Sequence, residues 1–489
     1  MDRRRYHRRR RYKKGMIRGA AAVFLLAAVI WFFTEAGQDS ERNRAGESDE
    51  GTYSSLREIE LEINQNIEQN TGEGIGEGST AGDLGAEAGG DIGAAGNLGA
   101  EASDTGAAGN RDVGNSGDTG AAGNLGAGDT GESVGGQGTG TASADMEEPE
   151  ITLVMVGDIL LHTPVAESGR REDGGYDFGA VFDGMREEIA EADLALVNQE
   201  VIIGGEELGI SGYPAFNAPY ELGDALAEAG FDVVLHATNH ALDKGKKGVL
   251  NCLAFWEEQY PGMAVLGIHG SGEDQEEIYV YEQEGIRIAV LNYTYGTNGI
   301  AMPADMPYAV DMLERERVAG DLQRARELAD FVVVCPHWGT EYTLEATAEQ
   351  RDWALFFADN GADLILGTHP HVIEPVEWVT TSDKSRDVLV YYSLGNFVNW
   401  TSGTGTGVAN RMVGCMARVD IERDEDGVVI KDYEAEPIVC HVEQGFGGVR
   451  VYPLDSYTEE LAQKNEIVDQ DGEFSLEYCR SLAQEVLGN

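Results

Sequence analysis

Short runs of apolar residues recur along the chain from residue 151 onward, and most of them end on a polar residue. Runs of this length, bounded by turn-forming residues, are typical of strands buried in a sheet. The first reads Ile-Thr-Leu-Val-Met-Val-Gly-Asp from Ile151 to Asp158. Together the runs predict strands over residues 151–158, 194–198, 233–237, 286–293, 331–337, 363–368 and 388–393.

Segments with helical periodicity lie between several of these strands, at residues 181–192, 220–229, 248–258, 314–329 and 347–360. Alternation of strands and helices predicts a layered α/β sheet. A hairpin is expected from strands at 411–421 and 428–439, with Asp426-Gly427 at the turn. We therefore expect one α/β domain over residues 150–445 and a helical extension over residues 446–489, with two surface helices after Asp455.

The chain begins with a basic segment followed by an apolar one. Residues 3–14 hold nine Lys and Arg, and residues 19–33 carry no charge and span roughly 22 Å as a helix. We expect residues 1–15 to be cytoplasmic and residues 16–34 to be a transmembrane signal anchor, so that a single-pass protein of the cell membrane presents its domain outside the cytoplasm. The alternative is a cleaved signal peptide ending near Thr34-Glu35-Ala36, which also exports the domain.

Residues 35–149 are dominated by Gly, Ala, Asp, Glu, Ser and Asn, and repeat Gly-Ala-Ala-Gly-Asn at 93, 106 and 120. Large apolar residues are too sparse there to offset the entropy of ordering the chain, so we expect a disordered linker. The formal net charge of the whole chain is -52. Such an acidic chain repels polyphosphates, which excludes nucleic acid as an expected partner.

The five cysteines are widely spaced and form no Cys-x-x-Cys pair. This spacing indicates neither a zinc knuckle nor a dense disulfide framework. We expect buried free thiols, with a Cys415–Cys440 bridge as the alternative.

Polar residues that can bind metals follow the predicted strands. In such sheets ligands bind beyond the carboxyl ends of the strands. A lone Asp there is more often a turn or a helix cap, but six of the nine histidines also lie at or near strand ends: 162, 236, 240, 337, 369 and 371. Imidazole mixed with carboxylate and amide oxygen favours Mn, Fe or Zn over calcium, and the sequence does not choose among the three.

The order of these motifs over residues 151–398 resembles the CapA family of poly-γ-glutamate capsule synthesis proteins, within the calcineurin-like metallophosphoesterase superfamily. The motifs are Gly157-Asp158, Asn198-x-Glu200, Asn239-His240-x-x-Asp243, His337-Trp338-Gly339-x-Glu341-Tyr342, His369-Pro-His371 and Ser393-Leu-Gly-Asn396. The resemblance implies a layered α/β/β/α metallophosphoesterase-like sandwich.

The resemblance also implies a site for two divalent ions. Asp158 and His371 would hold one ion, Asn239, His337 and His369 would hold the other, and Glu200 would bridge them. Two such ions generate a hydroxide and clamp a phosphoryl group. His240, with Asp243, would be the catalytic pair that protonates the leaving oxygen. His162 and Asn396 are further candidate ligands.

The chain departs from the family at two places: Gln199 stands where Leu is common, and the segment Pro214–Pro219 lacks an Arg that the family often has there. The resemblance implies a role in synthesis or export of poly-γ-glutamate or a related envelope polymer. Expected partners are the membrane, an anionic envelope polymer and the membrane subunits of a polymer synthase. Two alternatives remain open: a metal-dependent hydrolase of the cell envelope, and a non-catalytic module that binds an anionic polymer.

Overall fold

The computed structural model describes residues 150–400, 402–425 and 427–488. The predicted cytoplasmic segment, signal anchor and linker all lie outside these residues. Within the described part of the chain, no helix combines the length and hydropathy needed to cross a bilayer.

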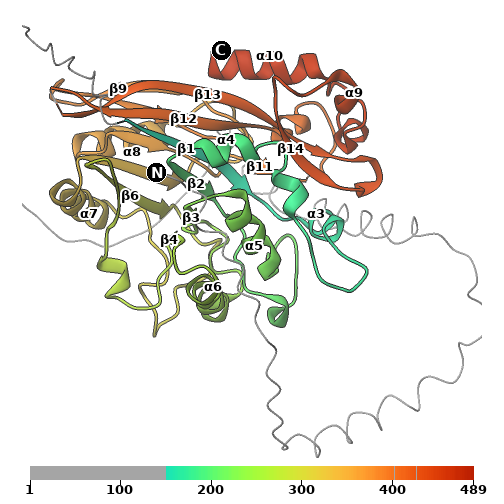
Figure 1. The fold of residues 1–489 in the computed structure, drawn as a ribbon, viewed down its shortest axis with the longest axis horizontal. Coiled ribbons are helices and arrows are strands. Elements are labelled where there is room, and N and C mark those ends of the chain that lie inside the picture. Colours follow the sequence, from blue (N-terminus) through green and yellow to red (C-terminus); the bar gives the residue numbers. More distant parts are fainter. Residues whose placement is uncertain (1–149, 401, 426, 489) are drawn as a thin grey trace, which may run out of the picture.

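Two sheets form the centre of the domain (Figure 1). The first has the order β14-β13-β12-β1-β2-β3-β4, with β11 paired in parallel to the end of β1. Strands β1 to β4 are parallel, whereas β12, β13 and β14 are antiparallel. The strands are β1 (Glu150–Ile159), β2 (Leu194–Asn198), β3 (Val233–Leu235), β4 (Ala264–Leu266), β11 (Asn396–Val398), β12 (Val413–Arg423), β13 (Val428–Val442) and β14 (Val449–Pro453).

The second sheet has the order β5-β6-β7-β8-β10-β9. Its central strands β6, β7, β8 and β10 are parallel, and an antiparallel strand lies at each edge. The strands are β5 (Tyr279–Gln283), β6 (Ile286–Thr294), β7 (Phe331–His337), β8 (Leu364–Leu366), β9 (Val376–Thr380) and β10 (Asp387–Tyr391).

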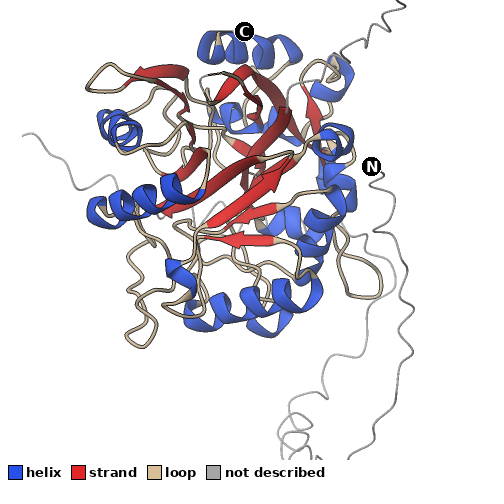
Figure 2. Cartoon of the chain, turned by 60° about the vertical axis from the view of Figure 1, so that its left-hand side comes forward, coloured by secondary structure: helices blue, strands red, loops and turns tan. Residues whose placement is uncertain are grey.

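Alternating side chains of the second sheet pack into two different cores. Ile288 and Val290 on β6 join the large core shared with the first sheet, whereas Ala289 and Leu291 join a smaller core with the outer helices. This is the period of two that a strand imposes on its side chains. Helices therefore lie outside and strands inside, as Figure 2 shows, and the layers run α/β/β/α.

The outer helices are amphipathic, and each of them packs against one of the two sheets. Those on the first sheet are α4 (Arg186–Glu191), α5 (Tyr220–Ala229) and α6 (Gly245–Gln259), and those on the second are α7 (Arg315–Leu328) and α8 (Ala348–Asp359). Shorter elements are α3 (Thr163–Ser168), α9 (Glu459–Ala462), η2 (Gly179–Phe182), η3 (Glu206–Leu208), η4 (Asp274–Glu276), η5 (Val408–Met412), η6 (Gln444–Phe446) and η7 (Glu466–Asp469). The last helix is α10 (Leu476–Leu487).

Most predicted elements are observed, but the helix predicted over residues 181–192 is wrong as a single element. The chain forms the 3-10 turn η2, then a turn, then the short helix α4. Gly184 lies at this break, and glycine is a poor helix former. Its backbone also packs closely on β14, where an added Cβ would lie 2.3 Å from the carbonyl oxygen of Val451. The sequence also missed the short strands β4, β5, β9, β11 and β14.

The predicted C-terminal extension contains both expected helices, α9 and α10, and adds the strand β14 to the first sheet. Cys479 and Leu482 of α10 are buried in the main core. The extension therefore packs as part of the domain. All five cysteines are free and buried, so Cys415 and Cys440 are not bridged.

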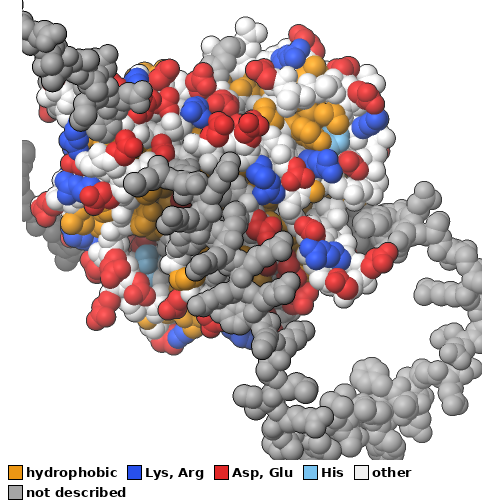
Figure 3. Space-filling model, viewed as in Figure 1, with side chains coloured by type: hydrophobic (Ala, Val, Ile, Leu, Met, Phe, Trp, Pro, Cys, Tyr) orange, Lys and Arg blue, Asp and Glu red, His pale blue; other side chains and the backbone are white. Residues whose placement is uncertain are grey.

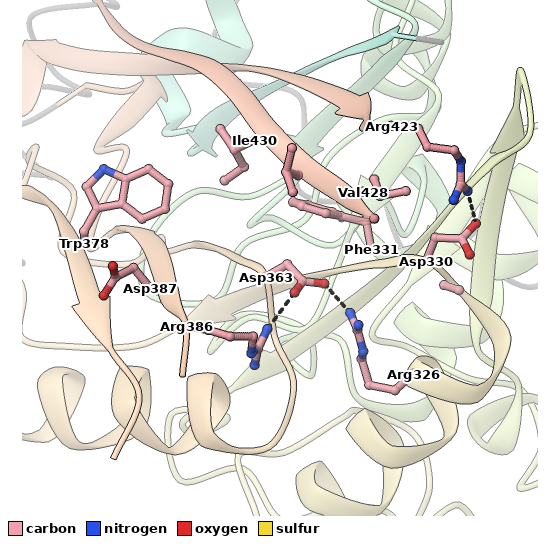
Figure 4. A pocket seen from close by; sticks show the side chains of 13 residues that line it. Arg326, Asp330, Phe331, Asp363, Trp378, Arg386, Asp387, Arg423, Val428 and Ile430 are labelled. Atoms are coloured by element: carbon pink, nitrogen blue, oxygen red, sulfur yellow. Dashed lines mark hydrogen bonds and ion pairs between the residues drawn. The ribbon is translucent and has the colours of Figure 1, made fainter. Parts of the chain in front are cut away.

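A groove of about 560 Å³ lies near the amino ends of β7, β8 and β10, where Phe331, Asp363 and Asp387 line it. Figure 4 shows Asp363 between Arg326 and Arg386, and Arg423 paired with Asp330. Because these arginines already have carboxylate partners, we interpret the groove as a region of polar contacts between the two sheets.

Acidic side chains are spread over the described surface seen in Figure 3, and Lys and Arg side chains are fewer there. The high acidity of the sequence is therefore visible on the folded domain as well as in the linker.

Candidate metal centre

The candidate site lies where the carboxyl ends of strands from both sheets meet. Asp158 belongs to β1, and Glu200 follows β2 by two residues. His337 is the last residue of β7, and His369 follows β8 in the second sheet. All four side chains are nearly or completely buried. Neither sheet alone contains the whole set.

One group of potential ligands consists of Asp158, Glu200 and His371, whose ligand atoms lie within 4.8 Å of one another. His371 Nδ1 lies 3.2 Å from Asp158 Oδ2 and 3.7 Å from Glu200 Oε2. Two carboxylates and one imidazole form a donor set that suits a divalent transition-metal ion.

A second group consists of Glu200, His337 and His369. His337 Nε2 lies 3.8 Å from Glu200 Oε1, and the rings of His337 and His369 lie 4.8 Å apart. Asn239 Oδ1 is 2.9 Å from His337 Nε2. Glu200 belongs to both groups. The bridging role that the family resemblance implies for Glu200 stays a prediction.

Glu200 provides the test of whether a cation fits. Its side chain is fully buried, and neither carboxylate oxygen has a hydrogen-bond partner within the described residues. Burying a carboxylate that has no hydrogen bond costs several kcal/mol, roughly, and among the described residues only imidazoles at 3.7–3.9 Å lie opposite these oxygens. Burial accordingly raises the pKa of Glu200 well above its ordinary value, although His371 acts in the opposite direction. A bound cation would remove this cost, so the residues present fit a metal ion.

The three histidines differ in their charge. Burial lowers the pKa of His337 and of His369 well below the ordinary value, and the neighbouring histidines lower it further. Neutral imidazoles are the form that binds metals. Burial also lowers the pKa of His371, but Glu200 and Asp158 outweigh this effect and raise it to about 10. Without a metal, His371 is therefore the counter-ion of the two carboxylates.

His240 and Asp243 form a pair beside the ligand groups. His240 Nδ1 lies 2.6 Å from Asp243 Oδ2, and its Nε2 lies 3.9 Å from Glu200 Oε1. Phe216 packs edge-on against the His240 ring and donates its backbone N–H to Asp243. The imidazole is thus held with one nitrogen on a carboxylate and the other directed toward the candidate metal centre, as a general acid requires.

Strained backbone is concentrated at this site. Asn298, Tyr342, His369 and His371 are four of the seven non-glycine residues with positive φ in the described part of the chain. Such conformations cost about 1–3 kcal/mol each and cluster at functional sites, because the surrounding structure must hold them.

The two further candidate ligands occupy different surroundings. Asn396 donates to the backbone oxygens of His371 and Arg411, and its Oδ1 lies 3.1 Å from His371 Nδ1. It therefore orients His371. His162 precedes α3, its ring packs edge-on to Phe216, and it is outside the potential ligand groups of the described residues.

Sequence reasoning did not assign roles to three residues that the fold brings to the site. Asn198 donates to Asp158 Oδ1, and Asn298 accepts from Asn239 Nδ2 and contacts His240. Glu341 forms a third potential ligand group with His369 and His371, and its side chain is exposed. The rule that polar residues follow strand ends would have found Asn298, which lies four residues after β6.

Comparison with known proteins matches residues 152–401 to the family described as "Bacterial capsule synthesis protein PGA_cap". The chain is 31% identical over 273 residues to "Capsule biosynthesis protein CapA" of Bacillus anthracis. The aligned segment covers 52% of this chain and 62% of the relative. The chain is also 34% identical over 181 residues to "PGA biosynthesis protein CapA" of Bacillus subtilis. This aligned segment covers 36% of this chain and 45% of the relative. The chain thus spans less than two thirds of either relative.

Among solved structures, the domain overlaps calcineurin-like phosphoesterase YfkN from Bacillus subtilis with a TM-score of 0.34 and 12% identity. The overlap covers 68% of this chain and all of that chain (100%).

Proposed function

The chain belongs to the PGA_cap family of bacterial capsule synthesis proteins, and from this membership we propose that it takes part in synthesis or export of poly-γ-glutamate or a related acidic envelope polymer. It does so through a divalent-metal site in its α/β domain. The observation that carries the proposal is that two groups of potential ligands share buried Glu200, whose carboxylate oxygens have no hydrogen-bond partner among the described residues.

The proposed ligands follow the geometry of these groups. Asp158, Glu200 and His371 would hold one ion, and a second ion would be held by Glu200, His337, His369 and Asn239. Each ion would be Mn, Fe or Zn. Ions bound there supply positive charge that neutralises carboxylates and attracts anionic groups. The protein residues supply the fixed geometry: Asn198 orients Asp158, and Asn396 orients His371.

The proposed setting is the outer face of the cell membrane. The apolar segment 16–34 would anchor the chain, and the linker 35–149 would let the domain reach the polymer that emerges from the synthase subunits in the membrane. A reporter fused after Asn489 tests this topology. A reporter active only outside the cytoplasm supports it, and cytoplasmic activity contradicts it.

Binding of a labelled γ-linked glutamate oligomer to the purified full-length chain tests the function itself. We expect binding that depends on Mn or Zn and is lost on chelation. His337→Ala should weaken it strongly because it removes a ligand, whereas His269→Gln, outside the potential ligand groups, should not. Metal-independent binding, or none at all, would contradict the proposal.

A second candidate function is metal-dependent hydrolysis of an envelope polymer, and the His240–Asp243 pair favours it. Such a pair donates a proton to a leaving group, which a pure binding module does not need. Hydrolysis of a chromogenic phosphodiester that requires a divalent ion and is lost in His240→Gln would support an enzyme. Metal-dependent polymer binding without turnover would instead support a non-catalytic module.

A further inference from the structure

Thr368 lies directly beside the proposed ligand His337 and is held there by backbone hydrogen bonds on both sides. It follows β8 by two residues, and its N–H donates to the oxygen of Pro336 at 3.0 Å. Its carbonyl oxygen accepts from the N–H of Trp338, also at 3.0 Å. Thr368 and His337 thus form a parallel bridge between two strand ends, and both side chains are buried.

The Thr368 hydroxyl oxygen contacts one nitrogen of the His337 ring, Nδ1, at 3.0 Å. Asn198 Nδ2 lies 3.5 Å from the same nitrogen but has only N–H groups to offer. Asp158 Oδ1, at 3.9 Å, is too distant for a hydrogen bond. Of these three groups, only the Thr368 hydroxyl can accept a hydrogen bond from an N–H at Nδ1.

The other ring nitrogen of His337 faces the candidate metal centre. His337 Nε2 lies 2.9 Å from Asn239 Oδ1 and 3.8 Å from Glu200 Oε1. A neutral imidazole carries one N–H, and only the nitrogen without the proton can bind a metal ion. An ion at Nε2 therefore requires the proton to be on Nδ1, where a buried N–H needs an acceptor.

We propose that Thr368 is a positioning residue for the second ion: its hydroxyl accepts the Nδ1 proton of His337 and thereby presents Nε2 to the metal. This inference rests on the proposed function, because it concerns the same metal site. Groups that accept the remaining N–H of a metal-bound histidine fix the tautomer and the orientation of its ring. The Thr368 side chain is branched at Cβ, so its hydroxyl has few alternative directions.

The first test measures Zn²⁺ binding by the purified full-length chain in competition with a chelator. Thr368→Val keeps the branched shape without the hydroxyl and should weaken binding of the second ion by roughly 10- to 100-fold. The first ion, proposed on Asp158, Glu200 and His371, should be affected little. Thr368→Ser restores the hydroxyl and should recover most of the affinity.

Thr381→Val is the matched control for this comparison. It removes the hydroxyl of another buried threonine, which donates to Asp383 and lies outside the potential ligand groups of the described residues. Both ions should bind to Thr381→Val with wild-type affinity. Equal weakening in Thr368→Ser and Thr368→Val would overturn the inference, because the hydroxyl would then not matter.

A second measurement reads the tautomer of His337 directly and needs no variant. In nitrogen NMR spectra of the Zn-loaded, histidine-labelled full-length chain, we expect the His337 proton on Nδ1. In Thr368→Val this proton loses its hydrogen bond, so its resonance should move upfield, whereas a role limited to packing would leave it in place. A proton on Nε2 in the Zn-loaded wild type would overturn the inference even if Thr368→Val does not fold.

The outcomes separate this inference from the proposed function. If the wild-type chain binds two ions and Thr368→Val binds both with the same affinity, the role of Thr368 is overturned and the proposed metal site stands. If the wild-type chain binds no ion under metal-replete conditions, the proposed metal site fails and the role of Thr368 fails with it.

Discussion

At the scale of single residues, the site is organised around buried polar atoms that lack hydrogen bonds. Within the described residues, neither carboxylate oxygen of Glu200 has a hydrogen-bond partner, and His369 Nδ1 has none either. Native proteins rarely leave buried polar atoms unsatisfied, so such atoms point to something that binds them.

Metal content should fall in steps that follow the two ligand groups. Glu200→Gln should remove most bound ion because it removes the shared ligand, whereas Asp158→Asn should affect only the group with His371. Metal analysis of the purified full-length variants under metal-replete conditions checks this. Equal loss in Asp158→Asn, Glu200→Gln and a control such as Glu443→Gln would contradict the shared-ligand assignment.

Glu374 should give a pH-dependent contribution to stability that is independent of metal binding. Burial raises its pKa to about 7, although Gln350 Nε2 donates to its Oε2 at 2.5 Å. Because the folded-state pKa lies above the unfolded value of about 4.3, this contribution is fully present below that value. It is lost as the pH rises through about 7.

The full loss corresponds to roughly 4 kcal/mol at about 1.4 kcal/mol per pKa unit. Denaturant unfolding of wild type and Glu374→Gln at pH 5 and pH 8 measures it. The wild type should lose more stability than the variant between these values, and parallel losses would show that Glu374 is not responsible.

At the scale of elements, close backbone contacts hold the ligand-bearing loops in place. A Cβ at Gly157 would lie 1.9 Å from the carbonyl oxygen of Gly395, and Asp158 N–H donates to that same oxygen. The strand that carries Asp158 and the loop before Asn396 can therefore approach only because residue 157 has no side chain.

Gly157→Ala should destabilise the fold by about 2 kcal/mol or more, since the backbone must move apart to admit the methyl group. It should also reduce metal content by displacing Asp158. Gly262→Ala is a matched control, because nothing lies within 4 Å of the added Cβ there. Thermal unfolding of the three proteins gives the comparison, and equal midpoints would mean that the contact relaxes freely.

The capping box at the start of α8 is a second local feature that holds an element in place. Thr347 Oγ1 accepts from Gln350 N, and the Gln350 side chain accepts from Thr347 N. Thr347→Ala should cost about 1 kcal/mol of unfolding free energy, measured in denaturant. Thr404→Ala, at an exposed position, serves as comparison. An effect no larger than that of Thr404→Ala would show that the cap contributes little.

At the scale of the whole molecule, the two sheets and the C-terminal segment share one core. Asn465 Nδ2 donates to the backbone oxygen of Cys440, and Tyr457 OH lies 2.9 Å from His441 Nδ1. Side chains buried from this segment are Tyr457, Ala462, Ile467, Phe474, Cys479 and Leu482.

Deletion of residues 455–489 should therefore unfold or aggregate the domain. The deletion would expose the core surface that these side chains cover. The lost burial would cost roughly 1.5–3 kcal/mol for each large apolar side chain. The total stability of a typical domain is only about 5–15 kcal/mol. Limited proteolysis and thermal unfolding check this against a chain lacking only residues 488 and 489. A truncated protein with an unchanged midpoint would make the segment a dispensable appendage.

The sequence by itself determined the fold class and most of the candidate ligands. The alternation of apolar runs and helical periodicity depends on local rules, so α5, α7 and α8 were predicted to within one residue. Polar residues at strand ends are equally local signals, and they identified Asp158, Glu200, His337 and His371. The edge strand β9 was missed because its residues are partly buried or exposed, so it lacks the apolar run that marks the short, fully buried strands β3 and β8.

Only the tertiary structure decided which of these residues share a ligand group and which others join them. Thr368 meets His337 through the pairing of neighbouring strand ends, and no spacing in the chain relates the two positions. The close contact of Gly184 with the backbone of β14 likewise joins segments more than 260 residues apart in the chain. Contacts between distant segments arise from packing the two sheets together, and a local pattern carries no information about them.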